Sequence, residues 1–404
     1  MTDAATASST TDEPDWPRHT SEARPWRSMT RGPREDRMLR EVTVSLPPLI
    51  AEVAYVPTAE DAAHIERAAV DITRLDAVHG PVLSSFATFL LRTEAVASSR
   101  IERHDASLAD LAKATIGVRA SKDAQVTVAA ARAVSRLVDA AGGSGAIGLD
   151  DVLAAHRTLL KDDPLDGPAA GALRTVQNWI GGSDYSPRGA VHVPPPPELV
   201  PAYMDDLVAF LGRDDLPAVA QAAIAHAQFE SVHPFTDGNG RIGRALIGAV
   251  WRRRGLAPTL VVPVASAMLA DTGEYFARVN AYREGRAAQF VRYLAVSASR
   301  AAQEARVSAD NLAELPGLWR AEVRPRAGSA AASILDALLD HPVLDGDLAR
   351  QVAGTSGAAA YEALGRLTEA GVLSRISTSQ RHGVWAATEV LGEIDDLTRR
   401  LREV

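Results

Sequence analysis

The chain has 404 residues, of which 46% are hydrophobic and 23% charged, and its formal net charge is −8. These values are ordinary for a globular protein of two or three domains, and the negative charge argues against a surface built throughout to bind nucleic acid. The chain contains no cysteine, which excludes disulfides, thiolate metal sites and a cysteine nucleophile and fits a reducing compartment.

No run of the sequence approaches the roughly 18 uninterrupted apolar residues of a membrane helix. The N-terminus also lacks the basic start and apolar core of a secretory signal. We therefore expect a cytoplasmic protein that has no membrane partner.

Residues 1–40 are rich in Ser, Thr, Asp, Pro and Arg and show no periodicity. This composition predicts a mostly disordered arm. Trp16 and Trp26 are its candidates for docking onto the folded body.

From about Asp61 to Ala305, apolar residues recur at spacings of three and four, and alanine is abundant. This periodicity predicts a mainly α-helical body, which we divide into an N-terminal helical region, residues 41–145, and a core, residues 146–305. Within the first region Ser98 and Glu102 lie four residues apart, so they share one face of a predicted helix.

One segment of the core, residues 181–197, is not helical. Four consecutive prolines at its end forbid a helix until Glu198. Residues 185–193 are predicted to form a short hairpin or flap.

The segment from His233 to Arg244 links two predicted helices and contains the parts that phosphoryl or nucleotidyl transfer needs. Gly238 and Gly240 can adopt a positive φ and let backbone N–H groups approach an anion, at the N-terminus of the helix that follows. Arg241 and Arg244 lie three residues apart in its first turn, where guanidinium groups can neutralise phosphate oxygens.

Two side chains of this loop supply the remaining chemistry. His233 can accept a proton near neutral pH, and Asp237 is a hard oxygen ligand of the kind that holds Mg²⁺ together with substrate phosphates. Each feature alone has an ordinary structural explanation, because D-G-N-G is a common turn and a histidine after an apolar helix is usually a core residue. Their combination at this spacing indicates a nucleotide site.

Residues 233–244 match at every defined position the motif H-x-F-x-D/E-G-N-G-R-x-x-R of the Fic (Fido) family. The resemblance extends over about residues 50–305 and implies a mainly α fold, in which a helical core carries a short β-hairpin flap. It also implies an activity: a protein adenylyltransferase, which moves AMP from ATP to a Ser, Thr or Tyr hydroxyl of a protein and releases pyrophosphate.

Carried onto this sequence, the resemblance makes His233 the base that deprotonates the target hydroxyl. Asp237 would hold a Mg²⁺ ion that bridges the α- and β-phosphates of ATP, and Phe235 would anchor the loop. The residues expected to bind the phosphates are Gly238, Asn239, Gly240, Arg241 and, at the γ-phosphate, Arg244.

The resemblance also covers segments that flank the loop. Residues 182–193 correspond to the family's flap, which aligns an extended target segment by strand-like hydrogen bonds. Tyr275 corresponds to a tyrosine near the nucleotide base, and we interpret it as core or pocket wall rather than as a catalytic residue. His226 is assigned to the core.

Ser98 and Glu102 resemble the inhibitory motif of Fic proteins, S/T-x-x-x-E-G/N, whose glutamate pairs with the second arginine of the loop and blocks the γ-phosphate site. We therefore expect an N-terminal inhibitory helix on which Glu102 pairs with Arg244 and prevents productive ATP binding. Arg103 stands where the family prefers Gly or Asn.

Residues 325–404 are interpreted as a separate unit. Three predicted helices, the third over residues 356–370, precede a β-hairpin, which is the pattern of a winged helix-turn-helix domain, and a last helix closes the chain. A DNA-binding version would place the third helix in a major groove and Arg375 and Arg381 on phosphates. Residues 356–388 carry only three Arg against two Glu, so we favour a protein partner or self-interaction over DNA.

Two alternatives to the adenylyltransferase remain open at this point. With Glu102 orienting water, the same site could remove AMP from a modified protein. The chain could instead be a DNA-binding regulator whose Fic core senses nucleotide, although the intact His233 argues against this because binding ATP needs no base. Phosphotransfer as in Doc-like relatives is disfavoured, since their loop typically has lysine in place of Gly240. The expected partners are ATP and a target protein or the chain itself, and a homodimer through the helical core is compatible with the sequence.

Overall fold

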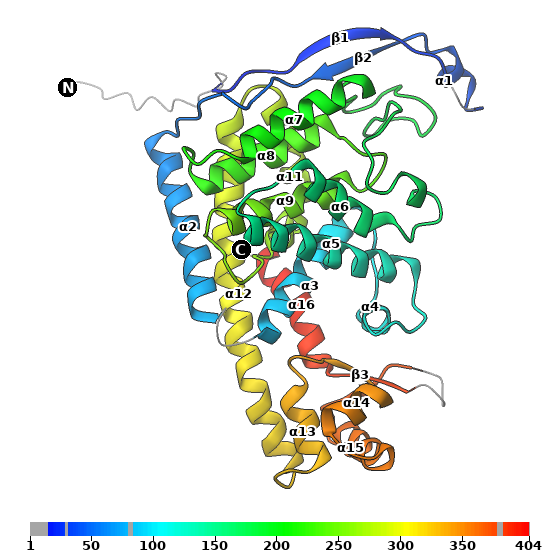
Figure 1. The fold of residues 1–404 in the computed structure, drawn as a ribbon, viewed down its shortest axis with the longest axis vertical. Coiled ribbons are helices and arrows are strands. Elements are labelled where there is room, and N and C mark those ends of the chain that lie inside the picture. Colours follow the sequence, from blue (N-terminus) through cyan, green and yellow to red (C-terminus); the bar gives the residue numbers. More distant parts are fainter. Residues whose placement is uncertain (1–14, 29–30, 80–83, 378–382, 404) are drawn as a thin grey trace, which may run out of the picture.

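The computed structural model describes residues 15–28, 31–79, 84–377 and 383–403. Helices dominate these residues, and the strands are few and short, as the periodicity predicts. Most helices form one body, with two N-terminal strands across one end and a smaller C-terminal unit at the other (Figure 1). No helix within the described part of the chain is both long and apolar enough to cross a membrane.

The body is built around α8 (Ala218–Val232), which is almost entirely buried. A helix that is apolar on all sides needs neighbours on all sides. α9 (Asn239–Arg253) packs along α8 and along α5 (Lys122–Ser144), while α12 (Ala287–Val323) lies against α8 and α2 (Ala59–His79). The loop between α8 and α9 is thereby fixed at both ends in the core.

The remaining helices of the body surround this centre. They are α3 (Ser84–Ile101), α4 (Leu108–Thr115), α6 (Leu149–Leu160), α7 (Val200–Leu211), α10 (Val264–Ala270) and α11 (Thr272–Arg283), with short 3₁₀ turns η1 (Gly167–Ala169) and η2 (Pro197–Leu199). Among them α3, the helix that bears Ser98, packs against α5, α9 and α10. This packing brings its C-terminal end to the first turn of α9.

The N-terminal arm differs from the prediction of disorder up to residue 40. Residues 1–14 lie outside the described residues, but β1 (Thr20–Pro25) pairs antiparallel with β2 (Glu41–Leu46). The short helix α1 (Arg34–Met38) lies between them in the chain. Because β1 is polar and largely exposed, no alternation of apolar residues marks it in the sequence, and its backbone pairing with β2 holds it.

Two tryptophans dock the arm onto the body, as the sequence indicated. Trp16 is 3% exposed, and its indole N–H donates a hydrogen bond of 3.2 Å to the hydroxyl of Tyr282. Trp26 lies edge-to-face on Trp179, with ring centroids 5.7 Å apart. Buried aromatic rings of this size outweigh the polar composition that favours disorder.

The non-helical insert contains less strand than predicted. A single bridge between Ile180 and His192 replaces the expected hairpin. The tip of the insert instead binds the N-terminal arm. There the carboxylate of Asp36 accepts hydrogen bonds from the hydroxyl of Ser186 at 2.6 Å and from Nε of Arg188 at 3.2 Å. Side-chain contacts with the arm therefore fix the flap where strand pairing does not.

The C-terminal unit contains the three predicted helices and the two strands that follow them. Its elements are α13 (Ala330–Ala337), β3 (Val343–Asp345), α14 (Gly346–Ala353), α15 (Gly357–Glu369), β4 (Ser374–Arg375) and β5 (Val384–Ala386), and the antiparallel sheet has the order β3-β5-β4. The three-residue strand β3 was not predicted, and Arg381 lies outside the described residues. The last helix, α16 (Thr388–Arg402), returns to the body and packs against α10 and α12. The winged-helix interpretation stays a prediction.

Replacing Trp16 by alanine tests whether the arm is part of the folded body. Because this ring is buried and hydrogen-bonded, Trp16→Ala is expected to lower the free energy of unfolding by about 3–5 kcal/mol, measured by denaturant titration. Val56→Ala, at a side chain that is 85% exposed, is the control and should leave stability within about 0.5 kcal/mol. A Trp16→Ala protein as stable as the unmodified chain would show that the arm does not dock.

Candidate active site

The loop between α8 and α9 begins with a strained residue. His233 ends α8 in the left-handed conformation, with φ 49° and ψ 61°, which costs a residue other than glycine about 1–3 kcal/mol. Its N–H still donates to the carbonyl of Phe229 at 2.8 Å. Contacts with the surrounding structure must therefore hold this turn.

Arg174 supplies most of these contacts. Its side chain is buried, and its guanidinium donates to the carbonyl oxygens of His233 at 2.9 Å, Pro195 at 2.6 Å and Val176 at 3.1 Å. Burial lowers its pKa to about 10. Sequence reasoning missed Arg174, because its partners are main-chain carbonyls that no residue pattern reveals.

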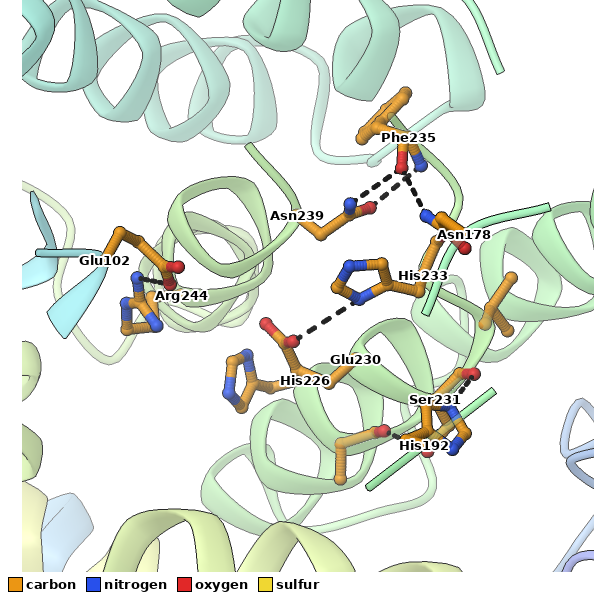
Figure 2. A network of polar contacts seen from close by, with 12 residues as sticks. Glu102, Asn178, His192, His226, Glu230, Ser231, His233, Phe235, Asn239 and Arg244 are labelled. Atoms are coloured by element: carbon orange, nitrogen blue, oxygen red, sulfur yellow. Dashed lines mark hydrogen bonds and ion pairs between the residues drawn. The ribbon is translucent and has the colours of Figure 1, made fainter. Parts of the chain in front are cut away.

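Asn239 closes the loop on itself. Its side-chain oxygen accepts from the N–H of Phe235 at 2.8 Å, and its side-chain nitrogen donates to the carbonyl of the same residue at 2.8 Å. Asn178 donates to that carbonyl from the other side, also at 2.8 Å (Figure 2). The side-chain amide of Asn239 is thus hydrogen-bonded within the loop. The predicted contact of Asn239 with a nucleotide would therefore be made by its backbone N–H.

A buried histidine supports the loop from below. The ring of His156 stacks on Phe235 with centroids 3.7 Å apart and planes 4° from parallel, so Phe235 is the anchor that the motif implies. Nδ1 of His156 accepts from the N–H of Gly171 at 2.9 Å, and the other ring nitrogen therefore carries the proton and donates to the carbonyl of Asp237 at 3.1 Å. Burial lowers the pKa of His156 to about 4. No residue pattern in the sequence indicates this role of His156.

The predicted phosphate-binding turn lies at the N-terminus of α9. Gly238 has φ 79°, and a Cβ there would lie 2.8 Å from a methyl group of Leu159, so both the backbone and the space require glycine. Arg241 is 3% exposed and donates to the carboxylate of Asp237 at 2.8 Å. The side chain of Asp237 is 49% exposed, which leaves part of this carboxylate facing solvent.

The second arginine of the loop points to α3. The side chain of Arg244 is 1% exposed and donates through Nε to the hydroxyl of Ser98 at 2.8 Å and through Nη2 to the carbonyl of Ser98 at 2.9 Å. Nη2 also forms an ion pair of 2.7 Å with Oε1 of Glu102 (Figure 2). The fold therefore brings together the three residues that the sequence grouped. Burial acts to lower the pKa of Arg244, but the carboxylate of Glu102, together with Tyr275 and Glu230, outweighs burial and leaves this pKa above its usual value.

The carboxylate of Glu102 lies directly on Gly240. A Cβ added at Gly240 would collide with Oε1 and would lie 2.9 Å from the carboxyl carbon of Glu102. This carboxylate therefore lies against the first turn of α9, the turn whose N–H groups have no partner within the helix. Arg103, the departure from the family motif, has φ 65°, the region that glycine and asparagine enter most easily. The arginine thus adopts the backbone conformation that the family's residues favour.

The imidazole of His233 is electrically neutral near pH 7. Burial, with Arg283 and Arg174 nearby, lowers its pKa to about 3. Its Nδ1 lies 4.0 Å from Oε2 of Glu230, a carboxyl group whose pKa burial raises to about 7. Nδ1 is enclosed beside Glu230, which leaves Nε2 as the ring nitrogen that can exchange protons. Sequence reasoning missed Glu230.

Tyr275 and His226 are core residues, as interpreted. Tyr275 is 1% exposed and His226 is fully buried. The hydroxyl of Tyr275 lies 2.9 Å from Nε2 of His226, and burial raises the pKa of this tyrosine. Tyr275 lies near Arg244 in the interior rather than on an open surface. A contact between Tyr275 and a nucleotide stays a prediction.

The region around the loop is similar to known proteins. Residues 146–250 match the model of the Fic/DOC family. The chain is 35% identical over 153 residues to the proteins named protein adenylyltransferase fic-1 of Caenorhabditis elegans and Caenorhabditis briggsae, a match that covers 37% of this chain and 27% of each relative. Protein adenylyltransferase Fic of Nematostella vectensis is 32% identical over 156 residues, 38% of this chain and 32% of that relative. The chain thus spans about a third or less of the length of these relatives.

The fold is similar to that of a solved structure over a longer stretch. A Fic family protein from Desulfovibrio desulfuricans superposes with a TM-score of 0.55 at 22% identity, covering 82% of this chain and 97% of that protein. At this identity the likeness concerns the fold alone. It reaches well beyond the segment that the family model matches.

Acid is expected to destabilise the fold around the loop. The pKa values of His156 and His233 are about 4 and about 3 in the folded protein, against about 6.5 for a free histidine. At pH values between the folded and the unfolded pKa, the unfolded chain binds more protons than the folded protein does. The two neutral histidines therefore contribute fully to stability above about pH 6.5, and this contribution is lost as the pH falls toward 4. The raised pKa of Glu230 acts in the opposite sense, and its contribution is lost as the pH rises through about 7.

The measurement is the denaturation midpoint between pH 7 and pH 4.5. His156→Phe keeps a ring stacked on Phe235 but removes one titrating group. The free energy of unfolding of this variant, obtained from its midpoint, should therefore fall less steeply as the pH is lowered, by up to about 1.4 kcal/mol per pH unit. His341→Phe, at an exposed residue of the C-terminal unit, should keep the original slope. An unchanged slope in His156→Phe would rule out this imidazole as a source of acid sensitivity.

Proposed function

Since residues 146–250 are a Fic/DOC domain, we propose that the chain is a protein adenylyltransferase that moves AMP from ATP onto a Ser, Thr or Tyr hydroxyl of a target protein or of itself. The observation that carries this proposal is the closed loop around His233, with a neutral imidazole on one side and the N-terminus of α9 on the other. The names of the relatives that match this domain agree with it.

The phosphates of ATP would bind at the first turn of α9. Backbone N–H groups of Gly238, Asn239 and Gly240 point along a helix N-terminus, which favours anions. Arg241 is buried beside them, and its Nε has no hydrogen-bond acceptor within the described part of the chain. Such an unpaired donor fits a site that is completed by a ligand oxygen.

His233 would act as the general base. Its Nε2 takes the proton of the target hydroxyl, and the hydroxyl oxygen attacks the α-phosphorus. The bond from this phosphorus to the oxygen that bridges the α- and β-phosphates breaks, and pyrophosphate leaves with that electron pair. Because burial holds the pKa of His233 below its usual value, the imidazole is unprotonated at neutral pH, which is the protonation state that a general base needs.

Asp237 fits a Mg²⁺ ion held by one carboxylate and by substrate phosphates. One of its oxygens pairs with Arg241, and the side chain is half exposed beside the N-terminus of α9. The described residues contain no cluster of three or more acidic, histidine or cysteine side chains that could hold a metal ion, so the proposed ion would depend on phosphate oxygens as further ligands. Such an ion would supply positive charge to the phosphates.

Glu102 would inhibit the enzyme by occupying the place of the γ-phosphate. Its carboxylate pairs with Arg244 and lies against Gly240. A phosphate and this carboxylate cannot share the same guanidinium and the same space. The brake would be released when Glu102 moves away from Arg244.

The C-terminal unit would bind a protein partner or a second copy of the chain. Its charge is close to balanced between residues 356 and 388, with three Arg and two Glu, whereas DNA readers carry a clearly basic face. In addition, Arg366 on α15 donates to the main-chain carbonyl of Val323 at 2.6 Å, so it is engaged inside the protein. The absence of cysteine fits a cytoplasmic setting.

Two substitutions test the activity and the brake together. The full chain and its variants would be incubated with ATP, Mg²⁺ and a cell extract, and AMP-modified peptides would be quantified by mass spectrometry. Glu102→Gly should raise transfer at least about tenfold, since it removes a competing anion. His233→Ala in that background should lower transfer by about 10²–10⁴-fold.

Glu66→Gly, at an exposed position of α2, controls for the effect of a glycine in a helix. Unchanged transfer in Glu102→Gly would argue against the brake. AMP on no peptide in any variant would remove the adenylyltransferase proposal, and release of AMP from a modified protein would replace it with the reverse reaction.

The metal requirement tests the role of Asp237. In the Glu102→Gly background, Asp237→Asn should raise the Mg²⁺ concentration for half-maximal transfer at least about tenfold, a loss of about 1.4 kcal/mol. Asp162→Asn, on the exposed turn after α6, should not change it. Equal Mg²⁺ requirements in the two variants would show that Asp237 does not hold the ion.

A further inference from the structure

A cavity lies apart from the loop, residues 233–244, that the proposed reaction uses. It has a volume of about 480 Å³ and is bounded by α3, α4 and α5. This volume lies within the range of small-molecule sites, about 300–1,000 Å³. The described residues that line it include none from the loop 233–244.

Three arginines face this cavity. Arg92 comes from α3, and Arg132 and Arg136 come from α5, four residues apart and therefore on one face of the helix. Within the described residues none of the three forms a hydrogen bond or an ion pair. The one acidic residue of the lining, Asp139, already accepts from the hydroxyl of Ser135 at 2.9 Å and lies 3.8 Å from a guanidinium nitrogen of Arg252.

Arg92 is the most informative of the three. It is partly buried, and burial without a nearby carboxylate lowers its pKa. A cation taken out of water needs an anionic partner or loses stability. Elsewhere in the described protein, the buried Arg244 pairs with a carboxylate and the buried Arg174 donates to main-chain carbonyls, whereas Arg92 faces the cavity with neither kind of partner.

The rest of the lining combines apolar residues with three threonines, Ser135 and Asp139. Leu91 and Val96 contribute from α3, Leu111 from α4, and Val128 and Ala131 from α5. A wall of this kind favours a hydrocarbon or aromatic group over water. The cavity thus combines arginine side chains with apolar surface, and an amphiphilic anion matches both.

We propose that this cavity binds a small organic anion, whose phosphate, sulfonate or carboxylate group pairs with Arg92, Arg132 and Arg136 and whose apolar part packs on Leu111 and Val128. The site is separate from AMP transfer and does not depend on it. Its occupant supplies the counter-charge that Arg92 lacks within the protein.

The test uses a fluorescent probe of the same chemistry. 8-Anilinonaphthalene-1-sulfonate would be titrated against the full chain, in parallel with its uncharged analogue N-phenyl-1-naphthylamine. Arg92→Gln and Arg132→Gln should each raise the dissociation constant of the sulfonate at least tenfold and leave that of the uncharged analogue unchanged. Arg74→Gln, at an exposed arginine of α2 outside the cavity, is the matched control and should bind as the unmodified chain does.

Melting temperature separates a binding role from a structural one. In the free protein Arg92→Gln should keep or raise the melting temperature, because it removes an unpaired cation, and it should abolish the rise that the sulfonate causes in the unmodified chain. Sulfonate affinity that is the same in Arg92→Gln and Arg74→Gln would overturn the proposal. An Arg92→Gln protein that melts several degrees lower or fails to fold would also overturn it, because Arg92 would then be a structural residue.

Discussion

The buried guanidinium of Arg244 has to keep an anionic partner beside it, and much of the site follows from this. An uncompensated charge at that depth would cost several kcal/mol, so α3 must approach closely enough for Ser98 and Glu102 to reach it. The carboxylate that meets this need also lies on Gly240, at the start of α9. The carboxylate of Glu102 thus stabilises Arg244, and under the proposed inhibition it would have to be replaced there by another anion to keep Arg244 paired.

The geometry of the loop is held by contacts that do not involve Glu102 or Arg244. Arg174 holds the carbonyl of His233, Asn239 holds both main-chain polar groups of Phe235, and His156 holds the carbonyl of Asp237. These contacts are made to the backbone from the buried side. In the reaction we propose, an anion could therefore replace the carboxylate of Glu102 on the side toward α3 while His233 and the N-terminus of α9 keep their places, as preorganised transfer chemistry would need.

The sequence predicts those features of this protein that depend on residues close together in the chain. Helical periodicity gave the body, the spacing of the loop residues gave the site, and the interval between Ser98 and Glu102 gave their shared helix face. Arg174 escaped prediction because it meets His233 across 59 residues, and main-chain carbonyls leave no pattern in a sequence. The strand β1 escaped because its residues are polar and exposed, so its order comes from a partner strand rather than from its own composition.

The N-terminal arm makes contacts that span most of the chain. Trp16 bonds to Tyr282, 266 residues away, and the N–H of Ser45 donates to the carbonyl of Val193. Closing such long loops is entropically costly and slow, and the partners are synthesised long after the arm itself. The arm is made before its partners and is consequently among the last segments to dock, so we expect a stage of folding in which the helical body exists while an indole and a strand edge are still uncovered.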